Sequence, residues 1–93
     1  MKYAYPVIFT RTEDEKDTIL IEVPDLEIMT EGFGVADAIE MARDAIGLSG
    51  ITLEDMSEPI PLPRDINEID LKKSEFASAE KSYVSLVDVD FTK

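Results

Sequence analysis

A chain of 93 residues is long enough for one small domain, and a hydrophobic content of 44% supplies side chains for its core. Acidic residues outnumber basic ones by 21 to 9, so the net charge of -12 disfavours nucleic-acid binding and favours a basic partner. The absence of cysteine and histidine excludes disulfide bonds, thiolate and imidazole metal ligands, and the commonest general base. Because the sequence shows neither a signal-peptide pattern nor an apolar run of membrane-spanning length, we expect a cytoplasmic protein without a cofactor or a membrane partner.

The first third of the chain predicts three strands. Residues 3–12 (YAYPVIFTRT) are β-branched and aromatic, and Pro6 cannot donate to a ladder, which indicates a sheet edge or a bulge at that point. A charged connection leads to TILIEV at 18–23, which forms an antiparallel hairpin with the first strand. In the turn PDLE that follows, Asp25 can accept a hydrogen bond from the backbone ahead of it. Residues 28–32 then complete an antiparallel meander.

One amphipathic helix is predicted from Val35 to about Ile46. Apolar residues recur there at spacings of three and four, so they form a stripe that can cover a sheet: Val35, Ala38, Ile39, Ala42, Ala45 and Ile46. Gly47 and Gly50 weaken or end the helix, although ITLEDM at 51–56 could add a turn or two.

The remainder of the chain predicts a long loop and a final strand. Residues 57–81 contain three prolines within five residues and no sustained period, so we expect a partly extended loop with a helical turn near 66–71. The alternating segment SYVSLVDVDF at 82–91 indicates a strand, which we expect in the centre of the sheet. The resulting order β-β-β-α-β places residues 1–93 in one α+β domain.

The stretch TEGFG at 30–34 is a candidate phosphate-binding turn because it precedes a helix. A dinucleotide fingerprint, G-x-G-x-x-G, needs a third glycine between its strand and its helix. Gly32 and Gly34 supply the first two, but Asp37 stands at the third position, where its carboxylate would oppose a phosphate. We therefore interpret these glycines as a tight strand-to-helix turn, with Gly34 as the N-cap and Asp37 suited to the helix dipole.

Pairs of acidic residues are the other candidate site. Asp88 and Asp90 on one strand face, or Asp25 and Glu27 beside a turn, could bind a divalent cation as in nucleases of the ribonuclease H type. Such pairs arise by chance among 21 acidic residues, and no histidine is available to activate a serine. We therefore expect no catalytic and no metal-binding residue, and predict that the protein is not an enzyme.

Four motifs, taken in order, resemble the HicB family of antitoxins. They are YPVIF at 5–9, VPDL at 23–26, TEG at 30–32 and AIEMARDAI at 38–46, and the proline-containing loop and closing strand match the family's layout. The resemblance implies a degenerate ribonuclease H-like β-β-β-α-β domain without nuclease activity, in which a three-stranded antiparallel meander precedes a helix and a final strand. It also implies a partner: a small, basic HicA-type mRNA interferase toxin, whose catalytic histidine the antitoxin covers.

Two features depart from the family pattern. Glu27, Ile28 and Met29 stand where the family often has P-G-C, which predicts a differently shaped turn. Many HicB antitoxins also carry a C-terminal DNA-binding module, whereas only FTK at 91–93 follows the alternating residues of the last strand. We therefore expect DNA binding only if the full-length protein carries such a module.

Glu22, Asp25 and Glu27 cluster beside the second predicted strand and its turn. We expect them to form a polar rim of the toxin-binding surface, and ordinary surface charge is the alternative for each. The resemblance also predicts a homo-oligomer, a dimer or a tetramer. Two other functions stay open on the sequence alone: a metal-dependent ribonuclease H-like nuclease and a small nucleic-acid-binding regulatory module.

Overall fold

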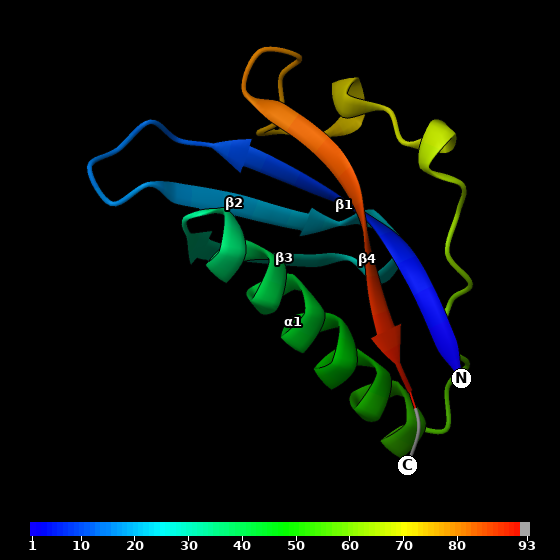
Figure 1. Ribbon diagram of the computed structural model, residues 1–93. Helices are drawn as coiled ribbons and strands as arrows, with labels where there is room; N and C mark the ends of the chain where they lie inside the picture. The colour runs from blue at the N-terminus through cyan, green and yellow to red at the C-terminus, as the bar shows by residue number, and fades with distance from the viewer. Residues whose placement is uncertain (92–93) are drawn as a thin grey trace.

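The computed structural model describes residues 1–91, which form a four-stranded antiparallel sheet with one helix against one face (Figure 1). The elements follow the order β1, β2, β3, α1 and β4, and their bounds are Lys2–Arg11, Thr18–Val23, Ile28–Phe33, Val35–Asp55 and Ser82–Asp90. This arrangement confirms the predicted α+β class and the β-β-β-α-β order.

The strands lie in the order β3-β2-β1-β4, so β1 and β2 are the two central strands. The strand β1 pairs with β4 from Lys2 to Thr10, but with β2 only from Ile8 to Arg11. Pro6 therefore lies in the part of β1 that has no β2 partner. The N–H that proline lacks thus costs no hydrogen bond between β1 and β2. The predicted sheet edge holds for this N-terminal half of β1, whereas the strand as a whole is central in the sheet.

The expectation of a central β4 is wrong, because β4 lies at an edge of the sheet. Its alternation reflects burial of one face: Val87 and Val89 pack under the helix, whereas Leu86 on the other face is 51% exposed. Alternation reports which face of a strand is covered, and it carries no information about how many neighbouring strands there are.

The helix α1 begins at Val35 as predicted, with Gly34 as its N-cap, but it ends at Asp55 instead of near Ile46. Both interior glycines lie against the sheet layer. A Cβ on Gly47 would lie 3.9 Å from Val89 Cγ2, and a Cβ on Gly50 would collide with the ring of Phe91. Tertiary packing of this small-residue face thus outweighs the weak helix propensity of glycine.

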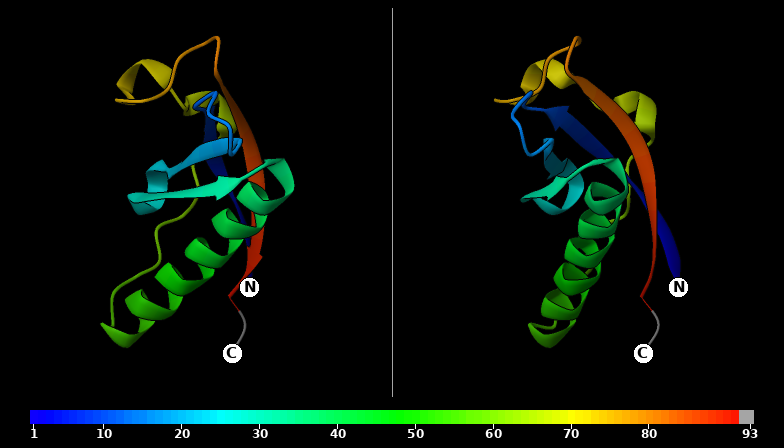
Figure 2. Two further views of the ribbon diagram at one scale, coloured as in Figure 1. Left: turned by 90° about the vertical axis from the view of Figure 1, so that its left-hand side faces the viewer. Right: turned by 60° about the vertical axis from the view of Figure 1, so that its left-hand side comes forward.

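The core lies between α1 and the sheet, and Figure 2 shows the helix as a separate layer along one side of the strands. Alanines on the buried helix face allow its backbone to lie close to the larger side chains of the strands. The buried residues are Tyr5, Val7, Phe9, Ile19, Ile21, Val23, Ala38, Ala42, Ile46, Val87 and Val89. Val35, expected in the buried stripe, is 41% exposed at the start of the helix.

The predicted loop at 57–81 returns from the far end of α1 along the N-terminal half of β1 to the start of β4 (Figure 1). It contains two short 3-10 helices, Ile66–Glu68 and Leu71–Lys73, where one helical turn was expected. The carboxylates of Asp65 and Asp70 cap them by accepting hydrogen bonds from backbone N–H groups two residues ahead. Within residues 1–91, no helix is both long and apolar enough to cross a bilayer.

Candidate functional site

The TEGFG turn is built for close packing of the helix against β3. A Cβ on Gly32 would lie 2.7 Å from Ala38 Cα, so only glycine fits there, and Gly34 has a positive φ of 86°. The N–H of Phe33 donates to the Asp37 carboxylate at 2.8 Å. This carboxylate already lies at the helix N-terminus, where a phosphate would bind. The interpretation of a strand-to-helix turn is confirmed by this geometry.

Asp88 and Asp90 of β4 are each paired with a cation. Arg43 of α1 lies 3.0 Å from the Asp88 carboxylate and lowers the pKa of that group. The N-terminal ammonium of Met1 lies 3.1 Å from Asp90 Oδ1. Within residues 1–91 no group of three or more acidic side chains is placed to hold a metal ion.

The PDL turn forms a short 3-10 helix, Pro24–Leu26, after which Glu27 adopts a left-handed φ of 54°. Asp25 was predicted to accept a hydrogen bond from the backbone just ahead of it. Its carboxylate instead binds Arg64 in the long loop. Its carboxylate accepts from the backbone N–H of Arg64 at 3.1 Å and from the guanidinium Nε at 2.5 Å. The Asp25 side chain is only 6% exposed, whereas that of Arg64 is 44% exposed, so the pair joins a covered carboxylate of the turn to a guanidinium at the surface of the loop.

Glu22 of β2 makes a second contact with the same loop. Its two carboxylate oxygens each lie 2.8 Å from the hydroxyl of Ser74, which donates to them. The same hydroxyl accepts hydrogen bonds from the backbone N–H groups of Phe76 and Ala77. Glu22 and Asp25 therefore hold the loop to the sheet at two separate points.

The loop and the β2–β3 hairpin, together with Ile8 of β1, line a partly open cavity of about 270 Å³. Its apolar lining comes from both sides and consists of Ile8, Val23, Pro24, Ile28, Met29 and Ile69. Its polar lining consists of Glu22, Glu27, Glu68, Asp70, Arg64, Lys73 and Ser74. We define this set of residues as the hairpin–loop cavity.

The structure brings the three predicted site residues together at the hairpin–loop cavity. Glu22 and Glu27 line it, and Asp25 binds Arg64, which also lines it. The loop residues of the cavity, among them Glu68, were not predicted, because they lie about forty residues further along the chain and only tertiary contacts bring them to the hairpin.

The polar lining carries more negative than positive charge. Four carboxylates face two cations, and one of these cations, Arg64, is already paired with Asp25. Glu27 and Glu68 are exposed, and neither has an ion-pair partner within residues 1–91. The polar part of the cavity lining is therefore suited to a cationic group.

A third contact holds the loop beside the sheet at Tyr5. Its hydroxyl donates to the carbonyl oxygen of Pro61 at 2.6 Å, and its side chain is fully buried. Burial, together with the nearby Tyr3 and Asp25, raises the pKa of Tyr5 to about 12. Since this hydroxyl is buried and paired, we assign it a structural role.

No protein-family model matches the sequence, and no curated protein matches it with significance. The structure is similar to a chain of a toxin–antitoxin complex from Streptococcus pneumoniae, with 27% identity and a TM-score of 0.79 over 98% of this chain and 71% of that chain. It is also similar to the antitoxin HicB of Burkholderia pseudomallei, with 24% identity and a TM-score of 0.72 over 98% of this chain and 64% of that one. The second neighbour carries the family name that the sequence motifs indicate, and the first belongs to a toxin–antitoxin complex. The chain therefore has a HicB-like fold and resembles a component of a toxin–antitoxin complex.

Proposed function

We propose that the protein is an antitoxin that binds and neutralises a small, basic HicA-type mRNA interferase toxin by covering its active site. The observation that carries the proposal is the similarity of 98% of the chain to a component of a toxin–antitoxin complex. The net charge of -12 supports a basic partner, because complementary charge speeds association and selects among partners.

The proposed toxin-binding surface includes the rim formed by Glu22, Asp25 and Glu27. Glu27 is the exposed member of the three and is suited to direct contact. Glu22 and Asp25 act in this proposal by holding the loop, since their carboxylates are bonded to Ser74 and Arg64.

The proposal includes the other properties that the family resemblance implies. The protein acts by binding in the cytoplasm rather than by catalysis, and it forms a dimer or a tetramer. It contacts DNA only if the full-length protein carries a further module. Size-exclusion chromatography with light scattering measures the oligomeric state of the chain directly.

Co-expression with a small, basic, histidine-containing protein encoded by the neighbouring gene tests the antitoxin function. We expect the partner alone to arrest growth and to degrade mRNA, and we expect this protein to co-purify with it and to restore growth. A partner variant without its histidine is the control, since it should bind equally well and cause no arrest. Continued growth arrest with both proteins soluble and at equal levels would contradict the proposal.

The purified protein alone provides the test against a nuclease. Cleavage of RNA that needs magnesium or manganese and is lost in Asp88→Asn would replace the antitoxin proposal by a metal-dependent nuclease. We expect no such cleavage, because the Asp88 carboxylate is bound to Arg43 and that of Asp90 to the N-terminal ammonium.

A further inference from the structure

The hairpin–loop cavity is a built feature of the fold. The loop is fixed to the turn after β2 by the Asp25–Arg64 pair and to β2 itself by the Glu22–Ser74 hydrogen bonds. Glu22, Arg64 and Ser74, which make these contacts, also line the cavity, whose volume is about 270 Å³. Its size is close to the lower end of the range for ligand pockets, about 300–1,000 Å³.

The chemistry of the lining distinguishes between classes of ligand. An anion would meet four carboxylates. A purely apolar group would bring the carboxylates of Glu27 and Glu68 out of water without a partner, which is costly. A cation with an apolar stem satisfies both parts of the lining, because its stem can lie against Ile28, Met29 and Ile69 while its head reaches Glu27 and Glu68.

An arginine side chain fits this description better than a lysine side chain. Its guanidinium group is planar, weakly hydrated and able to donate to several carboxylates at once, whereas the lysine ammonium is a compact and strongly hydrated charge. The acidic surface of the whole chain favours a basic protein as the source of that side chain.

We infer that the hairpin–loop cavity receives an arginine side chain of the toxin. This inference rests on the proposed antitoxin function and deepens it by naming the recognised group. Glu27 and Glu68 bind the guanidinium. Lys73, which lines the cavity and has no ion-pair partner among the described residues, opposes binding by like charge.

A capped arginine, N-acetyl-arginine N-methylamide, tests the cavity without the toxin. Titration followed by NMR should shift the signals of Ile28, Met29 and Ile69, and capped citrulline, the neutral isostere, should not shift them. The double variant Glu27→Gln/Glu68→Gln should weaken binding of the capped arginine at least about threefold, and Lys73→Gln should strengthen it by a similar factor.

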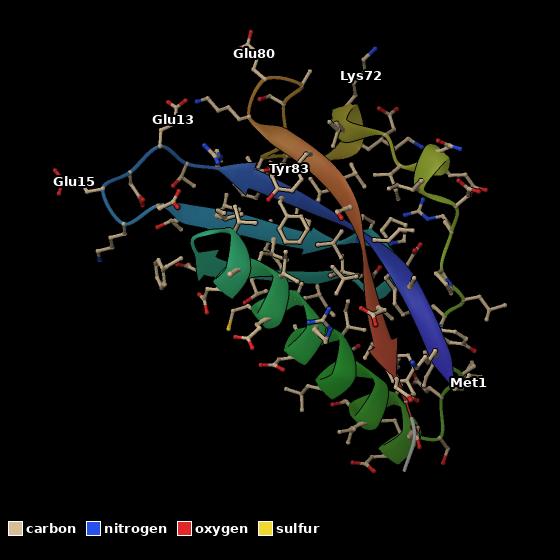
Figure 3. All side chains as sticks on the ribbon, viewed as in Figure 1. Met1, Glu13, Glu15, Lys72, Glu80 and Tyr83 are labelled. Carbon is tan, nitrogen blue, oxygen red and sulfur yellow. The ribbon has the colours of Figure 1, made fainter. Side chains whose placement is uncertain are left out.

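The matched control for charge is Glu15→Gln. Glu15 points away from the rest of the protein at the tip of the β1–β2 connection (Figure 3), and its replacement removes a negative charge far from the cavity. We expect it to leave binding of the capped arginine unchanged. Shifts spread over the whole acidic surface, or equal effects of the control and the cavity variants, would overturn the inference.

The same variants then separate the cavity from the antitoxin function. If the toxin binds the wild-type protein, its affinity for the double variant and for the Glu15→Gln control can be compared. Equal affinities would overturn the inference and leave the antitoxin function intact. Absence of toxin binding to the wild-type protein overturns the antitoxin function, and with it the toxin as the source of the arginine. Capped arginine still held in the cavity would then show that the cavity binds arginine from another source. Weaker toxin binding to the double variant only, with a gain in Lys73→Gln, supports both.

Discussion

Three glycines of this chain, at positions 32, 34 and 47, have different structural roles. Gly32 sits where the backbone of α1 crosses β3, and the space for a Cβ is taken by the Ala38 backbone. Gly34 provides the positive φ from which the helix starts. Gly47, inside α1, has ordinary van der Waals room and no unusual φ. Only the surroundings of each glycine distinguish these roles.

Replacement of Gly32 and of Gly47 by alanine should therefore have opposite effects on stability. Gly32→Ala should lower the free energy of unfolding by about 2–4 kcal/mol, because its Cβ would lie 2.7 Å from Ala38 Cα and 2.9 Å from Ala38 N, and backbone atoms cannot move aside cheaply. Gly47→Ala should raise the free energy of unfolding by about 0.5–1 kcal/mol, because alanine has the better helix propensity.

Urea unfolding of the two variants measures both effects against the wild-type protein. Each variant is the control for the other, since both add one methyl group. Equal losses of stability would contradict the close helix–strand approach at Gly32.

Tyr5 predicts a loss of stability at alkaline pH. Its pKa is raised from 10.0 to about 12 in the folded protein, so only the unfolded chain loses this proton between those values. The contribution of the protonated Tyr5 hydroxyl to the free energy of unfolding is fully present below pH 10 and is lost as the pH rises toward 12. Because each pKa unit corresponds to about 1.4 kcal/mol, the free energy of unfolding should fall by about 2–3 kcal/mol over this range.

Tyr5→Phe isolates this effect from the other groups that titrate at alkaline pH. At pH 7 the variant should be less stable than the wild-type protein by about 1 kcal/mol, because it lacks the hydrogen bond to Pro61. This difference should shrink and reverse above pH 10. A difference that stays constant from pH 7 to pH 12 would show that the hydroxyl titrates normally.

Among the elements, the long loop depends most on contacts that are distant in the sequence. It has no ladder partner between 59 and 77, and it is held instead through Tyr5–Pro61, Asp25–Arg64 and Glu22–Ser74. Each contact joins the loop to the β1–β2 half of the sheet. The loop should therefore open locally when one contact is lost, at a smaller free energy than global unfolding.

Arg64→Gln should loosen the loop. The Asp25 side chain is only 6% exposed, so its carboxylate would lose its guanidinium partner in a shielded place, and the free energy of unfolding should fall by about 1–2 kcal/mol. Hydrogen exchange of backbone amides in 64–74 should become faster, while exchange in β1 and β2 changes little. Arg11→Gln is the control, since the exposed Arg11 side chain has no ion pair within the described residues. Equal exchange rates in the two variants would contradict a tethering role for Asp25.

At the scale of the whole molecule, local sequence patterns predicted which strands and helix form. They predicted less well where the helix ends and which strands lie side by side. The strand at 18–23 is correct to the residue, because β-branched alternation reports a half-buried strand directly. The helix end and the place of β4 were wrong because they depend on packing between α1 and the C-terminal strand. The same limit applies to the site: the acidic residues of the hairpin were identified, but their partners Arg64 and Ser74 come from a loop without a periodic pattern.

The charge of the whole chain leads to a prediction about the rate of toxin binding. An excess of twelve negative charges on 93 residues should attract a basic toxin over a distance that salt shortens, because the Debye length falls from about 10 Å at 0.1 M to about 3 Å at 1 M. The association rate constant should therefore fall at least about tenfold between roughly 50 mM and 500 mM salt, whereas the dissociation rate constant should change less than about threefold. Stopped-flow measurements of association and dissociation at several salt concentrations distinguish these effects. An association rate constant that does not depend on salt would show that the acidic surface does not steer the encounter, and binding would then depend on contacts made at the interface itself.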